Sequence, residues 1–195
     1  ITQAGDYHSE LQGLGFAEFI GSVPFTENWS SASFETQQWT FDQPQTNWRI
    51  QANSGNPAPT ARFNFSPIAT NYSYSLISPR IQVPSSSQSL SLSFDLKLTD
   101  FQPGNTEWLK VHVWNGQSWQ QISAVSNNGN TAWVSYQYNI SENIGQEIKL
   151  KFEATGQNSG FISSWDLDNI SLQFMDWPTI NITPTELVQV LTNMG

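Results

Sequence analysis

The sequence predicts an all-β sandwich, and three observations support this fold class. Short segments in which apolar and polar residues alternate recur along most of the chain, as in strands that bury one face. Turn-forming residues separate these segments about every ten residues, a spacing typical of β-sandwiches. No amphipathic segment of helical length interrupts the series before Pro178.

The composition limits the class of protein and its partners. A length of 195 residues suits one sandwich domain with a sizeable core. Because cysteine is absent, stability must come from the core or from metal ions instead of disulfides. A formal net charge of −9 with 7 Lys+Arg argues against nucleic acids and anionic membrane surfaces as partners. No apolar run has the length of a membrane span and no signal peptide is present. We interpret Ile1 as the start of a mature secreted chain or of an expressed fragment.

The first elements are an arm and a strand that carries an acidic residue on its apolar face. Residues 1–22 form an N-terminal arm, whose glycines disfavour a long helix. The first core strand follows over 23–29, where Glu27 shares a face with apolar residues. Residues 51–60 are rich in Asn, Gly and Pro, which predicts a loop.

The middle of the chain contains the clearest strand and the clearest hairpin. Residues 90–98 alternate without a break, and Asp95 falls on their polar face, where we expect it to be solvated. Pro79 interrupts the segment 72–83, which is therefore an edge strand or a bend. The dipeptide Asn115-Gly116 is a strong hairpin signal. Further strands are expected at 61–65, 109–113, 119–122, 134–140 and 148–152.

The last strand begins at Asp168, which is again an acidic residue on an apolar face. From that residue onward, alternation places Asp168, Ile170, Leu172 and Phe174 on one face. Because the other three are apolar, this face is expected to point to the core. An unpaired charge in the core is very costly, so Asp168 needs a partner there.

The sequence changes character after Pro178. Residues 183–186 form a capping box with Pro at the first helical position, which predicts a short C-terminal helix. We therefore divide the chain into an N-terminal arm (1–22), a sandwich (23–176) and a linker with a short helix (177–195).

Several motifs occur together between Val23 and Phe174. They are Pro24-Phe25-Thr26-Glu27-Asn28-Trp29, Trp39-Thr40-Phe41-Asp42, Trp48-Arg49-Ile50, Leu76-Ile77-Ser78-Pro79-Arg80-Ile81, Trp119-Gln120-Gln121-Ile122 and Trp165-Asp166-Leu167-Asp168-Asn169-Ile170. In this order they resemble the cleaved-adhesin and choice-of-anchor J domains of bacterial secreted proteins. Related sandwiches include MAM domains and several carbohydrate-binding modules. The chain departs from the family pattern at Ser30, Ser75 and Asn169, where the family has an acid, an aromatic residue and an acid.

The resemblance implies a jelly-roll β-sandwich of two antiparallel sheets that binds sugars or proteins at the cell surface and carries out no reaction. Because the first and last strands of a jelly roll are neighbours, Glu27 and Asp168 are expected to converge and share a structural calcium ion. Calcium takes about six to eight oxygen ligands, which carboxylates and backbone carbonyls supply. The alternative is that each carboxylate accepts hydrogen bonds from backbone amides at a strand end.

Outward aromatic and basic residues suggest a ligand surface. Lys110, His112 and Trp114 share the outward face of one strand, and we regard them as the candidate site for a carbohydrate or a cell-surface protein. The alternative is that Trp114 covers the sheet edge beside the hairpin. Four tryptophans match family positions and are expected in the core, namely Trp29, Trp48, Trp119 and Trp165.

Two other functions remain as alternatives to a binding module. A glycan-degrading enzyme on the same scaffold needs two acids across a cleft, and no spacing in the sequence indicates such a pair. With 2 His, no Cys and no Gly-x-Ser-x-Gly motif, neither a catalytic triad nor a zinc site is indicated. The third possibility is a purely structural domain of a larger secreted protein. The sequence favours a non-catalytic extracellular binding module stabilised by calcium.

Overall fold

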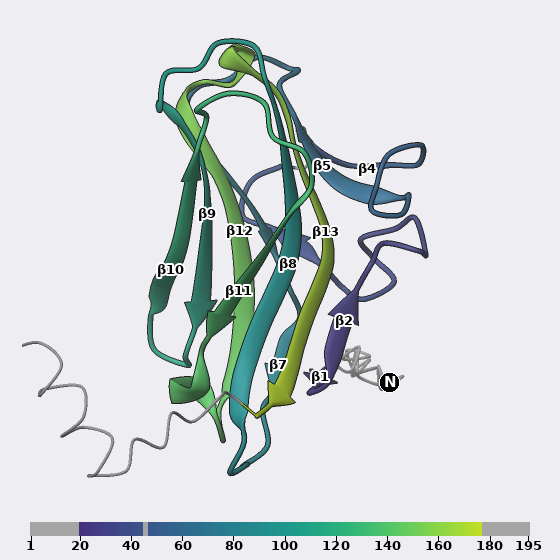
Figure 1. The fold of residues 1–195 in the computed structure, drawn as a ribbon, viewed down its shortest axis with the longest axis vertical. Coiled ribbons are helices and arrows are strands. Elements are labelled where there is room, and N and C mark those ends of the chain that lie inside the picture. Colours follow the sequence, from purple (N-terminus) through teal and green to yellow (C-terminus); the bar gives the residue numbers. More distant parts are fainter. Residues whose placement is uncertain (1–19, 45–46, 177–195) are drawn as a thin grey trace, which may run out of the picture.

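The computed structural model describes residues 20–44 and 47–176 of the chain. These residues form a jelly-roll β-sandwich of two sheets (Figure 1), which confirms the predicted fold class. Residues 20–22, at the end of the predicted arm, form a strand, whereas the predicted C-terminal helix lies outside the described residues. No helix within the described ranges is long and apolar enough to cross a bilayer.

The first sheet has seven strands. They are β1 (Ile20–Ser22), β3 (Thr40–Phe41), β6 (Thr70–Ile77), β7 (Arg80–Gln82), β9 (Glu107–Trp114), β10 (Trp119–Ser126) and β12 (Glu147–Asn158). Their order across the sheet is β10–β9–β12–β6–β3, and β7 with β1 extends the sheet beside the start of β12. Because β6 and β7 pair with successive parts of the same strand, Pro79 lies at a bend between them, as one of the two readings of that segment predicted.

The second sheet has six strands, and β13 lies at its centre. They are β2 (Phe25–Glu27), β4 (Trp48–Gln51), β5 (Thr60–Asn64), β8 (Ser89–Asp100), β11 (Val134–Asn139) and β13 (Ile162–Met175). Along one edge β13 pairs with β8, and along the other it pairs first with β5 and then with β2. The first and last strands of this sheet are therefore neighbours, as expected for a jelly roll. Two short 3-10 turns, Ser141–Asn143 and Ser159–Phe161, precede β12 and β13.

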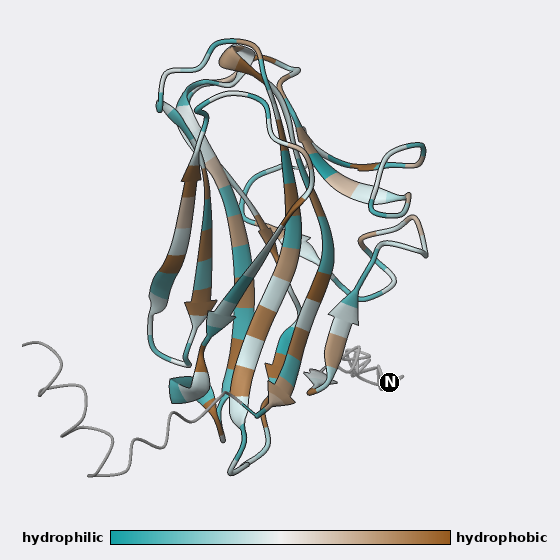
Figure 2. Ribbon diagram, viewed as in Figure 1, coloured by the Kyte–Doolittle hydropathy of each residue, from teal (hydrophilic) through white to brown (hydrophobic). Residues whose placement is uncertain are grey.

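The core lies between the sheets and is built by the alternation read in the sequence. Hydrophilic and hydrophobic bands alternate along β8, β12 and β13 (Figure 2). The rings of Phe94 and Phe152, from opposite sheets, meet edge to face with centroids 5.4 Å apart. Each such side chain stabilises the fold by about 1.5–3 kcal/mol when fully buried. Trp29, Trp48 and Trp165 are buried as expected.

The exception is Trp119, which is 37% exposed, so its predicted place in the core is wrong. The predicted hairpin explains its position. The side chain of Asn115 accepts hydrogen bonds from the amides of Gln117 and Ser118, and Gly116 adopts φ 91°. Trp114 and Trp119 consequently face each other across the ladder, on the side away from the core.

Candidate functional site

A bulge in β13 determines where the predicted metal ligands lie. Asp168 is opposite Asp95 in β8, but the next matched pair is Ser171 with Ser93, so β13 has one extra residue. Asn169 sits in this bulge with φ 49°. The extra residue resets the alternation, so that Asp168 and Ile170 no longer share a face. The prediction that Asp168 points to the core is therefore wrong, and it lies with Asp95 on the outward side of the sheet.

Asp168 is nevertheless fully buried, because the loop before β5 covers it. Its Oδ2 accepts a hydrogen bond from the amide of Asn56 at 2.6 Å, and its Oδ1 accepts one from the amide of Asn169 at 2.8 Å. Burial raises the pKa of Asp168, and these two hydrogen bonds oppose that effect, whereas repulsion from Asp95 adds to it.

Asp95 connects the bulge to the neighbouring loop and strand. Its Oδ2 accepts from the side-chain amides of Asn169 at 2.9 Å and Asn56 at 3.0 Å, and its Oδ1 accepts from the Ser135 hydroxyl at 2.5 Å. Burial by itself would raise the pKa of Asp95, but hydrogen bonds from Ser135, Asn169 and Asn56 outweigh it and lower the pKa. Asp95 is 9% exposed, so the expectation that it is solvated is wrong. Sequence reasoning missed its role because its position in the alternation marked it as an ordinary outward residue.

Glu27 does face the core, as predicted. It lies opposite Ile170 in the ladder between β2 and β13 and is 3% exposed. One carboxylate oxygen accepts from the amide of Trp29 at 2.7 Å and the other from the indole nitrogen of Trp39 at 3.0 Å. Burial raises the pKa of Glu27, hydrogen bonds lower it, and repulsion from Asp168 raises it further.

These contacts test whether the acids suit calcium. Within residues 20–44 and 47–176, no group of three or more acidic, histidine or cysteine side chains is arranged to hold a metal. Each oxygen of Glu27 and Asp168 already accepts an N–H hydrogen bond, as the alternative interpretation expected, but a carboxylate oxygen has a second acceptor site. No basic side chain is among the groups that shift the pKa of either acid. The two carboxylates are thus hard-oxygen donors whose negative charge is compensated by hydrogen bonds alone.

A second candidate site covers the outward face of β9, β10 and β12. We call it the tryptophan–lysine face. It comprises Trp108, Lys110, His112, Trp114, Trp119, Lys149, Lys151 and Glu153. Pairing between the strands places Trp114 between Trp119 and Lys149, and it places His112 opposite Lys151. The three residues predicted as a ligand surface, Lys110, His112 and Trp114, do lie together on this face.

Contacts within the face place charged groups against aromatic rings. The Lys149 ammonium lies 5.9 Å from the centroid of the Trp114 ring, and the Lys151 ammonium lies 4.8 Å from that of Trp119. Nε2 of His112 lies 2.7 Å from Oε2 of Glu153. That hydrogen bond is the main reason why the pKa of Glu153 is lowered to about 2. The face therefore combines two partly exposed indole rings with fixed cations and one carboxylate that stays ionised.

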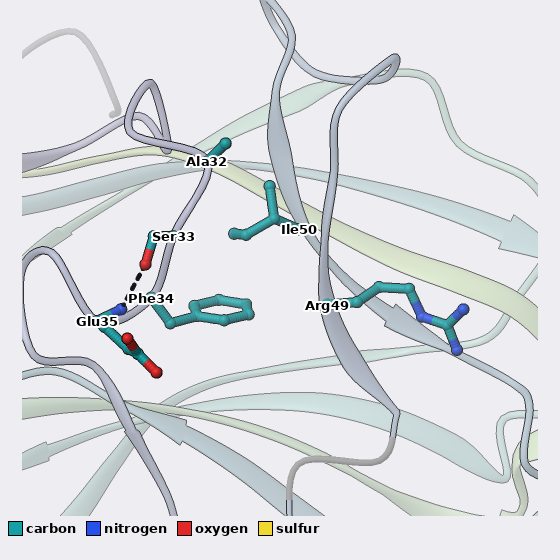
Figure 3. A pocket seen from close by; sticks show the side chains of 6 residues that line it. All are labelled: Ala32, Ser33, Phe34, Glu35, Arg49 and Ile50. Carbon is teal, nitrogen blue, oxygen red and sulfur yellow. Dashed lines mark hydrogen bonds between the residues drawn. The ribbon is translucent and has the colours of Figure 1, made fainter.

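Two surface depressions lie elsewhere, and the larger, of about 330 Å³, is shown in Figure 3. Its lining residues are Ala32, Ser33, Phe34, Glu35, Arg49 and Ile50. The Arg49 side chain points away from the others in Figure 3 and donates to the carbonyl of Ser66 at 2.8 Å. The Ser33 hydroxyl accepts from the Glu35 amide within the loop. The Arg49 guanidinium and the Ser33 hydroxyl are thus bound to backbone groups, and the polar side chains of this depression do not converge on a common point.

The second depression, of about 310 Å³, adjoins the bulge of β13. It is lined by Thr26, Glu27, Asn28, Asn169, Ile170 and Ser171. Because Glu27 and Asn169 are engaged in the hydrogen bonds described above, this depression belongs to the site formed by Glu27, Asp95 and Asp168.

Solved structures with the same fold belong to the classes that the sequence motifs suggested. The carbohydrate-binding module TmCBM61, solved with β-1,4-galactotriose, is 14% identical with a TM-score of 0.53, over 76% of this chain and 99% of that chain. The K3 cleaved adhesin domain of Lys-gingipain from Porphyromonas gingivalis is 13% identical with a TM-score of 0.55, over 76% and 97%. The CBM22-2 xylan-binding domain from Paenibacillus barcinonensis is 11% identical with a TM-score of 0.52, over 77% and 99%.

At these identities the similarity establishes a shared fold, and it confirms the resemblance to cleaved adhesin domains and carbohydrate-binding modules at that level. No protein-family model matches the chain, and no curated protein matches it either.

Proposed function

We propose that this protein is a non-catalytic, extracellular binding module that holds a carbohydrate on the tryptophan–lysine face. The observation that carries the proposal is the face itself, where Trp114 and Trp119 lie side by side among fixed polar groups. The fold is compatible with this role, since two of the similar structures are described as carbohydrate-binding. A protein on a cell surface is the other partner considered, and a binding panel separates the two.

The dimensions and chemistry of the face suit a sugar chain. From Trp108 to Trp114 the strand rises by about 3.4 Å per residue, or roughly 20 Å, which accommodates several sugar rings in a row. Indole rings offer flat apolar surfaces, and neighbouring polar groups fix the orientation of a ligand. Lys151 and Glu153 supply donors and an acceptor beside these rings, whereas His112 is 9% exposed and its Nε2 is engaged by Glu153.

The ionisation of the face favours binding over catalysis. Glycoside hydrolysis needs a carboxylic acid that remains protonated near neutral pH, and this requires a raised pKa. Glu153 has the opposite shift, because His112 lowers its pKa to about 2. The acids with raised pKa values, Glu27 and Asp168, are buried and bound to backbone or indole N–H groups. Neither is placed to protonate a sugar on the surface.

Binding to immobilised polysaccharides tests the proposal directly. We expect wild-type protein to bind at least one polysaccharide in a broad panel. Trp114→Ala and Trp119→Ala should each weaken that binding by about fivefold to 150-fold, which corresponds to about 1–3 kcal/mol as for other stacked rings. Trp133→Ala is the matched control, because Trp133 lies in the loop before β11, outside the face. Binding that survives both substitutions in folded protein would contradict the proposal.

We also propose that Glu27 and Asp168 share a structural calcium ion that ties β2 to β13. Calcium would supply positive charge between two buried carboxylates that repel each other, and this role needs no chemistry on a substrate. At a calcium concentration one hundred times Kd, about 2.7 kcal/mol of stabilisation is expected, which corresponds to about 5–10 °C in Tm.

Melting curves with calcium and with a chelator test the ion. We expect chelation to lower Tm, and acidification to weaken the calcium effect, because protonated carboxylates do not bind the ion. Without calcium, acidification has the opposite effect on the stability that these two acids contribute. The raised pKa values of Glu27 and Asp168 mean that repulsion is relieved as pH falls through them, so stability from this pair rises toward acid. Identical curves in calcium and chelator would leave hydrogen bonds alone as the partners of both acids.

A further inference from the structure

The distribution of positive charge is uneven in this acidic chain. The formal net charge is −9, and the sequence has four lysines: Lys97, Lys110, Lys149 and Lys151. All but Lys97 belong to the tryptophan–lysine face. Three of the four lysine ammonium groups therefore lie on one face of a protein whose formal net charge is negative.

Few carboxylates balance these ammonium groups. Glu153 is the acid on the face, and its oxygens are engaged by Ser73 at 2.7 Å and His112 at 2.7 Å, with Lys151 at 4.0 Å. Glu147, the first residue of β12, forms an ion pair with Arg80 at 3.2 Å. Beyond β6, Asp42 accepts a hydrogen bond from the Ser75 amide.

The lysines differ in their partners. Lys110 lies opposite Glu153 in the ladder, yet no ion pair joins them in the described structure. Lys149 contacts the Trp114 ring, and Lys151 lies two residues further along the same strand. Across the ladder, the three lysines stand opposite Trp114 (Lys149), His112 (Lys151) and Glu153 (Lys110), and not opposite one another. The face thus carries three ammonium groups and a single carboxylate, Glu153, and a bound anion would compensate the remaining positive charge.

We infer that the ligand of the tryptophan–lysine face is an anionic polysaccharide, whose carboxylate or sulfate groups contact Lys110, Lys149 and Lys151 while its sugar rings stack on Trp114 and Trp119. This inference rests on the proposed function and specifies its ligand class. Duplex nucleic acid fits less well, because it carries one charge per about 1.7 Å and the chain is acidic outside this face. An acidic polysaccharide spaces its charges by sugar units, which matches isolated lysines set among aromatic rings.

Paired probes that differ only in charge test the inference. Dextran sulfate is compared with dextran, and polygalacturonate with its methyl ester, by titration calorimetry against the full chain. We expect a charged probe to bind more tightly than its neutral counterpart, and its affinity to fall as NaCl rises from about 0.05 M to about 0.5 M. The two charged probes distinguish sulfate from carboxylate as the source of the anion.

Single substitutions locate the contact. Lys110→Gln, Lys149→Gln and Lys151→Gln are each expected to weaken binding of the charged probe up to about fivefold, as for partly exposed ion pairs. Lys97→Gln is the matched control, since Lys97 lies in β8 on the other sheet, and its binding should equal that of wild type. Melting curves check that each variant is folded.

The outcomes separate this inference from the proposed function. If neutral and charged probes bind equally, with Trp119→Ala weakening both and the lysine variants unchanged, the carbohydrate site stands and the anionic ligand is wrong. If a single-stranded DNA oligonucleotide binds as tightly as the charged polysaccharides and Trp119→Ala has no effect, attraction is non-specific and the inference is also wrong. If no polysaccharide binds, the proposed function itself fails.

Discussion

Replacing Asp95 by Ala should destabilise the fold by about 3 kcal/mol, although the sequence marks Asp95 as an ordinary outward residue. The carboxylate accepts three hydrogen bonds, from Ser135, Asn169 and Asn56, at 2.5–3.0 Å. A hydrogen bond to a charged group contributes about 1.5–3 kcal/mol, so the gross loss is about 5–9 kcal/mol. Desolvation of the carboxylate and its repulsion with Asp168 are relieved at the same time, which offsets part of that loss.

Thermal unfolding followed by circular dichroism is the assay. For a domain of this size, about 3 kcal/mol corresponds to a decrease in Tm of about 6–12 °C. Ser93→Ala is the matched control, because Ser93 lies two residues away on the same outward side of β8 and forms no side-chain hydrogen bond in the described structure. A decrease for Asp95→Ala no larger than that for Ser93→Ala would refute the reasoning. The lowered pKa also gives a sign: stability from Asp95 is present above its unfolded pKa and is lost as pH falls through the folded value.

Further predictions concern the packing around Gly156, the stability at acidic pH and the bulge in β13. Gly156→Ala should cost about 1–3 kcal/mol in chemical denaturation, because a Cβ would overlap the buried Glu107 carboxylate and lie 2.8 Å from the Thr106 carbonyl oxygen; an unchanged midpoint would mean that Glu107 moves aside. The pKa of Glu153 is lowered from 4.5 to about 2, so about 2 kcal/mol, reduced for its partial exposure, should be lost as pH falls through that window. Glu153→Gln should flatten the acid side of the plot of Tm against pH, and parallel plots for the two proteins would contradict the shift. At Asn169, with φ 49°, Val should lower stability by at least about 1 kcal/mol more than Gly in thermal melts, because a β-branched residue is strained there; equal melts would argue against the bulge.

The fold followed from local patterns, and so did part of each site. Residues 90–98 were identified as a strand because their alternation is a property of the strand itself, with a period of two residues. Asn115-Gly116 identified the hairpin, and Glu27 was placed correctly because no bulge separates it from its apolar neighbours. Lys110 and His112 shared a face for the same local reason. The prediction for Trp119 was wrong because the family motif implied a core position, whereas pairing with Trp114 places Trp119 on the outward side of the sheet.

The sequence by itself determined which segments are strands and, within an unbroken strand, which side chains share a face. Only the tertiary structure decided on which face the residues beside the bulge lie and which loop buries them, because strand register and burial depend on segments far apart in the chain. One extra residue at Asn169 reverses the face of Asp168, and the amide that then buries it comes from Asn56, 112 positions earlier. Likewise, Lys110 lies opposite Glu153, and His112 opposite Lys151, only because β9 pairs with β12. Alternation is a local property of a strand, whereas pairing between distant strands determines which groups surround a charged side chain.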